Sequence, residues 1–124
     1  LLNLNTDFKI TGIEYNETIY KSIKEKETTN VSLINEDFIN YESETNYDLI
    51  IGNPPFYVMK KGDVDKKYHE YFDGRPNIFI LFIIKSLGLL NENGILSFIL
   101  PKSFLNCIYY DKTRNHIYNN YDDE

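Results

Sequence analysis

The sequence has 124 residues and a formal net charge of −6, with hydrophobic residues at 42% and charged residues at 26%. This length suits one small domain or part of a larger one, and the composition is that of a folded globular chain. Two full domains and a disordered acidic tail are therefore excluded. The longest unbroken apolar run, residues 78–84, is far shorter than the ~20 residues that cross a bilayer, which excludes a membrane-spanning chain.

The cysteine content and the start of the chain point to a cytoplasmic protein. Cys107 is the only cysteine, so an internal disulfide and a Cys-X-X-Cys metal or redox site are both excluded. No basic leader followed by an apolar stretch opens the chain, which argues against secretion. The acidic balance also argues weakly against this chain gripping a nucleic-acid backbone by itself.

The first half of the chain predicts three strands and one helix. Residues 8–14 alternate and are rich in β-forming side chains, so they predict a strand that ends on an acid. Residues 17–27 are charged and compatible with a helix, and residues 31–34 predict a second strand. Residues 47–51 form a continuous apolar run, which is typical of a strand that is buried on both faces.

The second half predicts a long loop, two helices and a fourth strand. Residues 57–74 are polar and predict a loop, and loops of this length are often functional. Residues 78–90 are apolar enough for a buried helix, which residues 91–94 should stop. Residues 95–100 predict a strand. Residues 108–120 predict a surface helix.

This order of elements predicts an α/β fold with an open sheet of parallel strands. Ligands of such sheets bind at the carboxyl ends of the strands. Glu14, Asp37 and the tetrapeptide Asn53-Pro54-Pro55-Phe56 all fall at predicted strand ends. We therefore expect the functional site at this edge.

The tetrapeptide predicts a pocket for an amino group. Two successive prolines fix the backbone and remove two N–H donors, which leaves carbonyls that only accept hydrogen bonds. The carboxamide of Asn53 adds another acceptor, and Phe56 offers a flat face on which a planar group could stack. A plain turn is the alternative, because Asn-Pro and Pro-Pro often break strands.

The tetrapeptide and its flanks resemble the amino-methyltransferases that use S-adenosylmethionine, specifically the adenine-N6 DNA methyltransferases of restriction–modification systems. Their signature is Asn or Asp, Pro, Pro and an aromatic after the fourth strand of the sheet, and here it is Asn53, Pro54, Pro55 and Phe56. Residues 78–90, 93–101, 103–106 and 109–121 continue the likeness, which covers most of the chain. The resemblance implies a partial Rossmann-like methyltransferase sheet, mostly parallel.

The same resemblance implies a binding site for the cofactor. The family's acid at the end of the second strand binds the ribose hydroxyls, and Glu14 stands there. Asp37, with Phe38 beside it, matches the acid that contacts the cofactor adenine. A helix-start acid is the alternative for Glu14, and a plain turn is the alternative for Asp37.

The implied reaction acts on an adenine that is flipped out of double-stranded DNA. Its N6 hydrogens point to Asn53 and to the backbone carbonyl of Pro54, while Phe56 stacks on the ring. Cys107 has no role in this chemistry, and neither His69 nor His116 has partners at the spacing of metal ligands. We therefore expect no metal. Tyr57, Lys60 and Lys61 could contact DNA, or could belong to a solvated loop.

Two other functions stay open from the sequence. The same tetrapeptide occurs in enzymes that methylate an rRNA guanine N2, an RNA adenine or a protein glutamine. A non-catalytic, methyltransferase-like subunit that supports an active partner is the second alternative. The segment Pro101-Lys102-Ser103-Phe104-Leu105-Asn106 looks more like the DNA enzymes.

Parts of the family pattern are missing. The glycine-rich turn after the first strand has no counterpart in residues 1–8, and the chain stops before the family's last strands and any target-recognition domain. We expect residues 1–124 to form a single partial catalytic domain that lacks the first strand and the C-terminal strands. The missing parts would come from the remainder of the enzyme or from a complementing chain.

Overall fold

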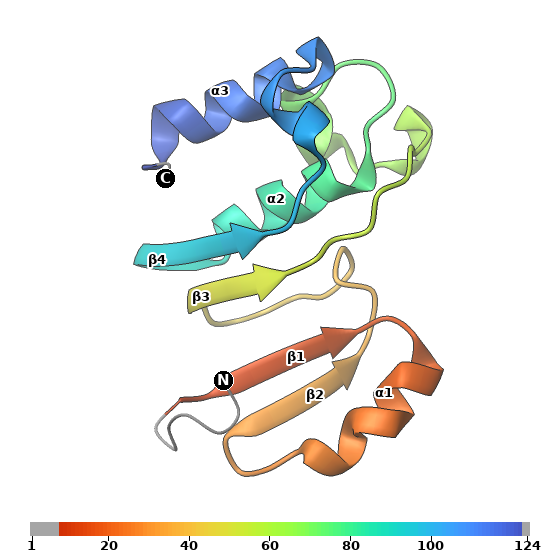
Figure 1. Ribbon diagram of the computed structural model, residues 1–124, viewed down its shortest axis with the longest axis vertical. Coiled ribbons are helices and arrows are strands. Elements are labelled where there is room, and N and C mark those ends of the chain that lie inside the picture. The colour runs from red at the N-terminus through yellow and green to blue at the C-terminus, as the bar shows by residue number, and fades with distance from the viewer. Residues whose placement is uncertain (1–7, 123–124) are drawn as a thin grey trace. The chain divides into compact units, whose positions relative to one another are not determined.

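The computed structural model describes residues 8–122 and divides the chain into two compact units, Leu1–Glu42 and Ser43–Glu124. Each unit is an α/β structure and is treated by itself (Figure 1). That both units belong to one domain stays a prediction. The sequence shows no glycine-rich turn in residues 1–8, and residues 1–7 lie outside the described residues.

The first unit is a pair of parallel strands joined by a helix. β1 (Ile10–Glu14) pairs with β2 (Val31–Asn35), and Ile10 lies opposite Val31 while Glu14 lies opposite Asn35. α1 (Glu17–Ile23) connects the two strands and packs beside them in Figure 1. The side chain of Asn16 caps α1 by accepting a hydrogen bond from the backbone N–H of Ile19 at 3.0 Å.

Two element boundaries in this unit differ from the sequence-based expectation. β1 begins at Ile10, two residues later than expected, because the ladder starts where the N–H of Ile10 reaches the carbonyl of Asn30 at 2.8 Å. The α-helix ends at Ile23 and continues only as the 3-10 turn Lys24–Lys26. That turn contains no apolar residue, so no burial sustains a longer helix.

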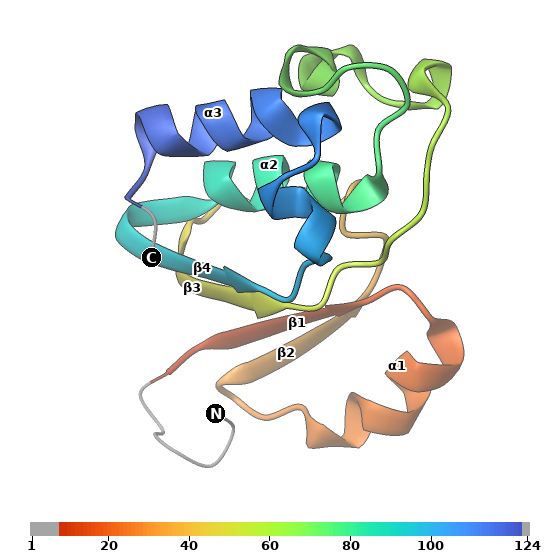
Figure 2. The same cartoon turned by 45° about the horizontal axis from the view of Figure 1, so that its top comes forward.

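The second unit has β3 (Tyr47–Gly52) and β4 (Leu90–Phe98) as a parallel pair, with Leu49 opposite Ile95 and Gly52 opposite Phe98. α2 (Ile78–Gly88) covers one face of this pair, and α3 (Asp111–Asn120) lies on the far side of α2 (Figures 1 and 2). The layers are therefore strand pair, α2 and α3, in that order.

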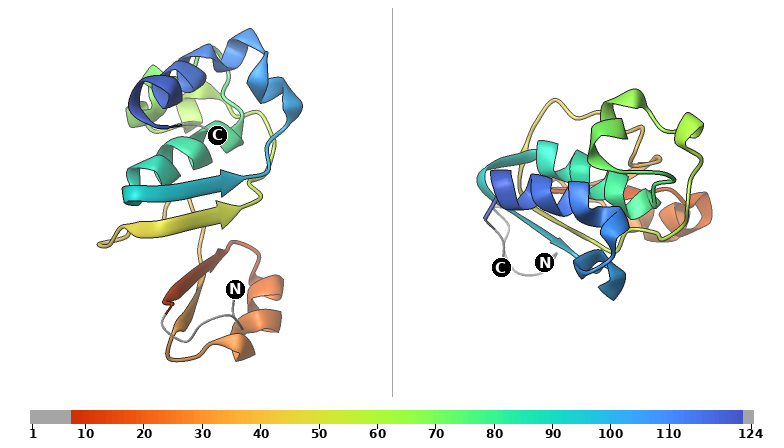
Figure 3. Two further views of the ribbon diagram at one scale, coloured as in Figure 1. Left: turned by 60° about the vertical axis from the view of Figure 1, so that its left-hand side comes forward. Right: turned by 90° about the horizontal axis from the view of Figure 1, so that it is seen from above.

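The core of the second unit is built around α2, as the turned views in Figure 3 help to follow. Most of this helix is buried, which agrees with its apolar sequence. Phe79, Ile80 and Ile83 form the centre of the cluster with Leu87 and Phe104. The inward side chains of β4, among them Leu96 and Phe98, pack against this cluster, as does Ile117 of α3.

The turn expected at residues 91–94 lies inside β4 instead of before it. The helix ends at Gly88, and pairing resumes at once because Leu90 lies opposite Tyr47. Between that pair and the Leu49–Ile95 pair, β4 has extra residues that form a bulge, where Asn93 adopts a φ of 64°. The strand also ends at Phe98, two residues earlier than expected.

The expectation that residues 47–51 are buried on both faces is wrong for the described chain. Leu49 is 47% exposed and Ile51 is 54% exposed. Ile95 of β4 and Ile99, which directly follows β4, are exposed as well, at 62% and 67%. The reason is that α2 covers only one face of the pair, and no described element of the second unit covers the other.

The predicted partial Rossmann-like α/β fold is confirmed at the level of its strands. The described residues form two two-stranded parallel sheets, β1 with β2 and β3 with β4, and no described strand bonds to both.

The segment expected to be a polar loop, residues 57–74, is ordered by short helices. It contains the 3-10 helices Lys61–Asp63 and Lys66–Tyr71. Val64, Tyr68 and Phe72 are buried, which anchors the loop on the second unit. The expected surface helix over residues 108–120 is a 3-10 turn, Ile108–Tyr110, followed by α3.

Candidate functional site

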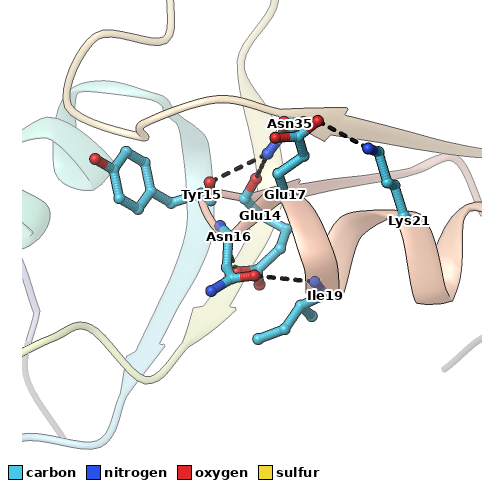
Figure 4. A network of polar contacts seen from close by, with 7 residues as sticks. All are labelled: Glu14, Tyr15, Asn16, Glu17, Ile19, Lys21 and Asn35. Atoms are coloured by element: carbon cyan, nitrogen blue, oxygen red, sulfur yellow. Dashed lines mark hydrogen bonds and ion pairs between the residues drawn. The ribbon is translucent and has the colours of Figure 1, made fainter.

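Glu14 ends β1 and is partly exposed, and Figure 4 shows it beside Asn16 and Asn35. One carboxylate oxygen accepts a hydrogen bond from the backbone N–H of Asn16 at 2.9 Å. The side-chain amide of Asn35 donates to the backbone carbonyls of Glu14 and Tyr15, at 2.8 and 3.1 Å. These bonds fix the chain between β1 and α1, and among the described residues the other carboxylate oxygen has no hydrogen-bond partner.

Asp37 and Phe38 follow the neighbouring strand, β2. The carboxylate of Asp37 accepts a hydrogen bond from the backbone N–H of Ile39 at 3.0 Å. Its backbone carbonyl also accepts from the N–H groups of Asn40 and Tyr41, both at 3.0 Å. The turn that the sequence left as the alternative for Asp37 is thus present. The second carboxylate oxygen of Asp37 takes no part in the hydrogen bonds of this turn.

Asn53 to Phe56 follow β3 directly. Asn53 is exposed, and within residues 8–122 its carboxamide forms no hydrogen bond. In the same described range the carbonyls of Asn53, Pro54 and Pro55 accept no backbone hydrogen bond, whereas the carbonyl of Gly52 accepts one from Ile99 at 3.3 Å. The strand pairing therefore stops at Gly52, and the exposed carboxamide of Asn53 is available to a ligand, whereas Pro54 is buried.

Phe56 lies between the core and the surface. It is 48% exposed, and its ring meets that of Phe79 edge to face, with centroids 5.7 Å apart and an interplanar angle of 83°. This contact is a preferred aromatic geometry, and it holds one edge of Phe56 while leaving about half of the side chain open. A planar group could pack on the open part.

The structure groups the predicted residues at strand ends. Glu14 and Asp37 with Phe38 share the carboxyl edge of the β1–β2 pair, since the strands are parallel and Glu14 lies opposite Asn35. Asn53 to Phe56 lie at the carboxyl end of β3 in the other unit. The cofactor-binding and catalytic roles of these residues stay predictions.

A pocket of about 480 Å³ in the second unit contains residues that the sequence analysis did not single out. Arg75, Tyr109 and Tyr110 line it, together with Val58 and Phe72. Burial raises the pKa of the Tyr110 phenol above its ordinary value, so this group adds no negative charge to the pocket near neutral pH. No sequence signal joins residue 75 to residues 109 and 110, because only the fold brings them together.

The described residues contain no cluster of three or more His, Cys, Asp or Glu side chains that could hold a metal ion. His69 instead lies against the protein, with its Nε2 3.0 Å from the carbonyl oxygen of Val64. Among the described helices, none is both long enough and apolar enough to cross a membrane.

Comparison with known proteins gives one family and several relatives. The chain is 29% identical over 118 residues to the type II methyltransferase M.AccI of Acinetobacter calcoaceticus, which covers 88% of this chain and 22% of the relative. It is 36% identical over 89 residues to the modification methylase CviBIII of Paramecium bursaria Chlorella virus NC1A, covering 71% of this chain and 23% of the relative. For the type II methyltransferase M.HincII of Haemophilus influenzae the identity is 33% over 96 residues, covering 71% and 19%.

The chain thus spans about a fifth of the length of these relatives. The family model described as Eco57I restriction-modification methylase matches residues 1–123, which is nearly the whole chain. Together with the parallel strand pairs and the Asn-Pro-Pro-Phe turn after β3, this match establishes that the chain belongs to the Eco57I restriction-modification methylase family.

Proposed function

We propose that this chain forms part of the catalytic domain of a DNA methyltransferase that transfers a methyl group from S-adenosylmethionine to the N6 of adenine. The family match and the relatives, which are named methyltransferases and modification methylases, support the methyl transfer and the DNA substrate. The adenine target is supported by the tetrapeptide Asn53-Pro54-Pro55-Phe56. The enzyme would act in the cytoplasm as the modifying half of a restriction system.

The edge of the β1–β2 pair fits the cofactor. Glu14 has a partly exposed carboxylate whose hydrogen bond to the backbone N–H of Asn16 fixes its position. A carboxylate held in this way can accept hydrogen bonds from both hydroxyls of a ribose. Asp37 and Phe38, after the neighbouring strand, would contact the adenine of the cofactor. When bound, S-adenosylmethionine supplies an electrophilic methyl group.

The exposed carboxamide of Asn53, directly after β3, is the observation that carries the proposal. The carboxamide oxygen of Asn53 and the carbonyl of Pro54 would each accept one N6 hydrogen of an adenine flipped out of the duplex. Holding both hydrogens would aim the nitrogen lone pair away from these two acceptors. The half-exposed Phe56 would stack on the base and keep it in place.

The acceptors also favour the transition state. As the nitrogen shares its lone pair with the incoming methyl carbon, its N–H groups become more positive and bind more strongly to fixed oxygen acceptors. Solvent then takes up the proton that the nitrogen releases. The prolines contribute because they hold the backbone carbonyls rigid, so little reorganisation is needed during the reaction.

The test is methylation by the full-length protein in cells whose DNA lacks N6-methyladenine. Mass spectrometry of digested genomic DNA should detect N6-methyladenine, and Asn53→Ala should lower the rate of transfer by about 10²-fold or more, as for loss of one preorganised contact. Asn119→Ala, at an exposed position of α3, is the matched control and should keep full activity.

Three results would contradict this proposal. Unmethylated DNA alongside methylated rRNA or protein would show a different acceptor. Activity of Asn53→Ala within about twofold of the unmodified protein would show that the acceptor pocket is not catalytic. A full-length protein that modifies nothing by itself but activates a second chain would be a supporting subunit.

A further inference from the structure

The pocket lined by Arg75 shares no lining residue with the cofactor and adenine sites proposed above. All of its lining residues belong to the second unit, so its shape does not depend on how the units are placed. Its volume of about 480 Å³ is that of a small-ligand site. A pocket of this kind recognises a ligand by the few polar groups that its walls present.

Arg75 supplies an uncompensated positive charge. Its side chain is exposed, and within the described part of the chain it forms no ion pair and no hydrogen bond. The acidic side chain that also lines the pocket, Asp73, is already paired, because its carboxylate lies 2.7 Å from the ammonium of Lys112. The pocket is thus left with a free guanidinium, which binds a phosphate group through two parallel hydrogen bonds.

Apart from Asp73, Arg75 and Asn77, whose side chain caps α2, the pocket is lined by apolar or aromatic residues. Phe72 is buried, whereas Tyr109 is 60% exposed and Val58 is 62% exposed. Gly74 adopts a φ of 63°, a left-handed conformation that glycine favours, and a side chain there would approach the ring of Tyr109 to 3.6 Å. A ligand that fits these walls carries, next to its anionic group, a ring whose C–H groups can pack on an aromatic side chain.

The pocket is linked directly to the Asn53-Pro54-Pro55-Phe56 turn. The N–H of Ile78 donates to the carbonyl of Tyr57 at 2.9 Å, and the N–H of Met59 donates to the carbonyl of Pro76 at 2.8 Å. These bonds tie the segment after Phe56 to the segment that carries Arg75.

The aromatic side chains make a second link between the turn and the pocket. Phe79 contacts both Phe56 and Tyr110, with ring centroids 5.7 and 5.2 Å apart. Phe79 therefore joins the turn to Tyr110 of the pocket wall.

We propose that this pocket binds the sugar–phosphate backbone of the methylated DNA strand next to the target nucleotide, with Arg75 pairing to the phosphate and Tyr109 packing against the deoxyribose. The proposal rests on the proposed function, because it takes the strand to be the substrate. A flipped nucleotide needs its neighbouring phosphates held in place, and phosphate contacts fix the register of a protein on DNA.

The test is the salt dependence of DNA binding by the full-length protein. Binding of short fragments of unmethylated phage DNA is measured between 50 and 200 mM salt for the unmodified protein and for Arg75→Gln. The loss of one phosphate contact should make the slope of log K against log salt shallower by about 0.9. It should also weaken binding at 50 mM salt by about tenfold or more, as for a lost hydrogen bond to a charged group.

Two variants control for the loss of charge and of structure. Arg75→Lys keeps the charge and should keep the slope, although its affinity falls because lysine cannot bind a phosphate through two fixed donors. Lys66→Gln removes an exposed positive charge outside the pocket and should leave the slope unchanged. Circular dichroism of each variant should match the unmodified protein.

The outcomes separate this proposal from the proposed function. If Arg75→Gln keeps the slope and the affinity of the unmodified protein, the pocket does not bind the DNA backbone, even where adenine methylation is intact. A slope change with single-stranded RNA but not with duplex DNA also overturns it. If the slope changes as expected but no N6-methyladenine forms, the pocket binds the DNA backbone, and the adenine acceptor of the proposed function is wrong.

Discussion

Ser86 and Thr113 are both fully buried, with 0% exposure, but their hydroxyl groups differ in hydrogen bonding. The hydroxyl of Thr113 donates to the carbonyl of Tyr71 at 2.7 Å and thereby ties α3 to the loop before α2. The hydroxyl of Ser86, within the described residues, has no hydrogen-bond partner. A buried polar group without a partner costs free energy, so Ser86 lowers the stability of the core.

We expect Ser86→Ala to raise the free energy of unfolding by about 1 kcal/mol, because it removes an unsatisfied hydroxyl and adds the residue with the highest helix propensity. Thermal unfolding of the full-length protein, followed by fluorescence, measures the change. Thr113→Val is the matched variant and should lower stability by about 1–3 kcal/mol, since it leaves the carbonyl of Tyr71 unpaired. A destabilised Ser86→Ala would mean that the hydroxyl is bonded.

At the scale of single elements, the bulge in β4 is the feature that sequence patterns missed. Asn91 to Gly94 look like a turn between a helix and a strand, but Leu90 already pairs with Tyr47. Gly94 is required there, because a Cβ would lie 2.9 Å from the carbonyl oxygen of Asn91 and 3.1 Å from that of Tyr47. Both contacts are with backbone atoms, which cannot rotate away.

We expect Gly94→Ala to lower the free energy of unfolding by about 1–3 kcal/mol, because relieving these contacts must shift the backbone of the bulge. Gly62→Ala is the matched control, since no atom lies within 4 Å of the added Cβ, and it should change stability by less than about 0.5 kcal/mol. Chemical denaturation of the two variants side by side makes the comparison. Equal stability of both would show that the bulge tolerates a side chain.

At the scale of the whole molecule, the exposed face of the β3–β4 pair is the dominant feature. Leu49, Ile51, Ile95 and Ile99 are all about half exposed or more. Parallel strands are normally covered on both faces, because each face carries apolar side chains. The chain matches only about a fifth of the length of the relatives named above.

We expect residues 1–124 by themselves to bind S-adenosylmethionine weakly and to methylate nothing, because uncovered strand pairs do not hold a preorganised site. Isothermal titration calorimetry of the isolated chain measures the affinity, and full-length protein is the control. A dissociation constant in the micromolar range for the isolated chain would refute this expectation.

The sequence by itself determined the type and order of the elements and the residues at the strand ends. The apolar runs of α2 and β3 and the Asn-Pro-Pro-Phe turn depend on neighbouring residues, so their signals are local. Glu14, Asp37 and Asn53 accordingly lie at the expected strand ends. The predicted ends of the helices and strands were less accurate than their types. The helix predicted over residues 17–27, for example, ends at Ile23, because no residue of the turn after it is buried to stabilise a longer helix.

Only the tertiary structure decided which faces are buried and which distant residues share a pocket. The exposure of Leu49 and Ile51 depends on which elements pack against β3, and an apolar stretch of sequence does not contain that information. Arg75 and Tyr109 are far apart in the sequence, and they line one pocket because α2 and the following segments fold back on the loop. Non-local contacts of this kind carry no periodic signal, so the fold alone reveals them.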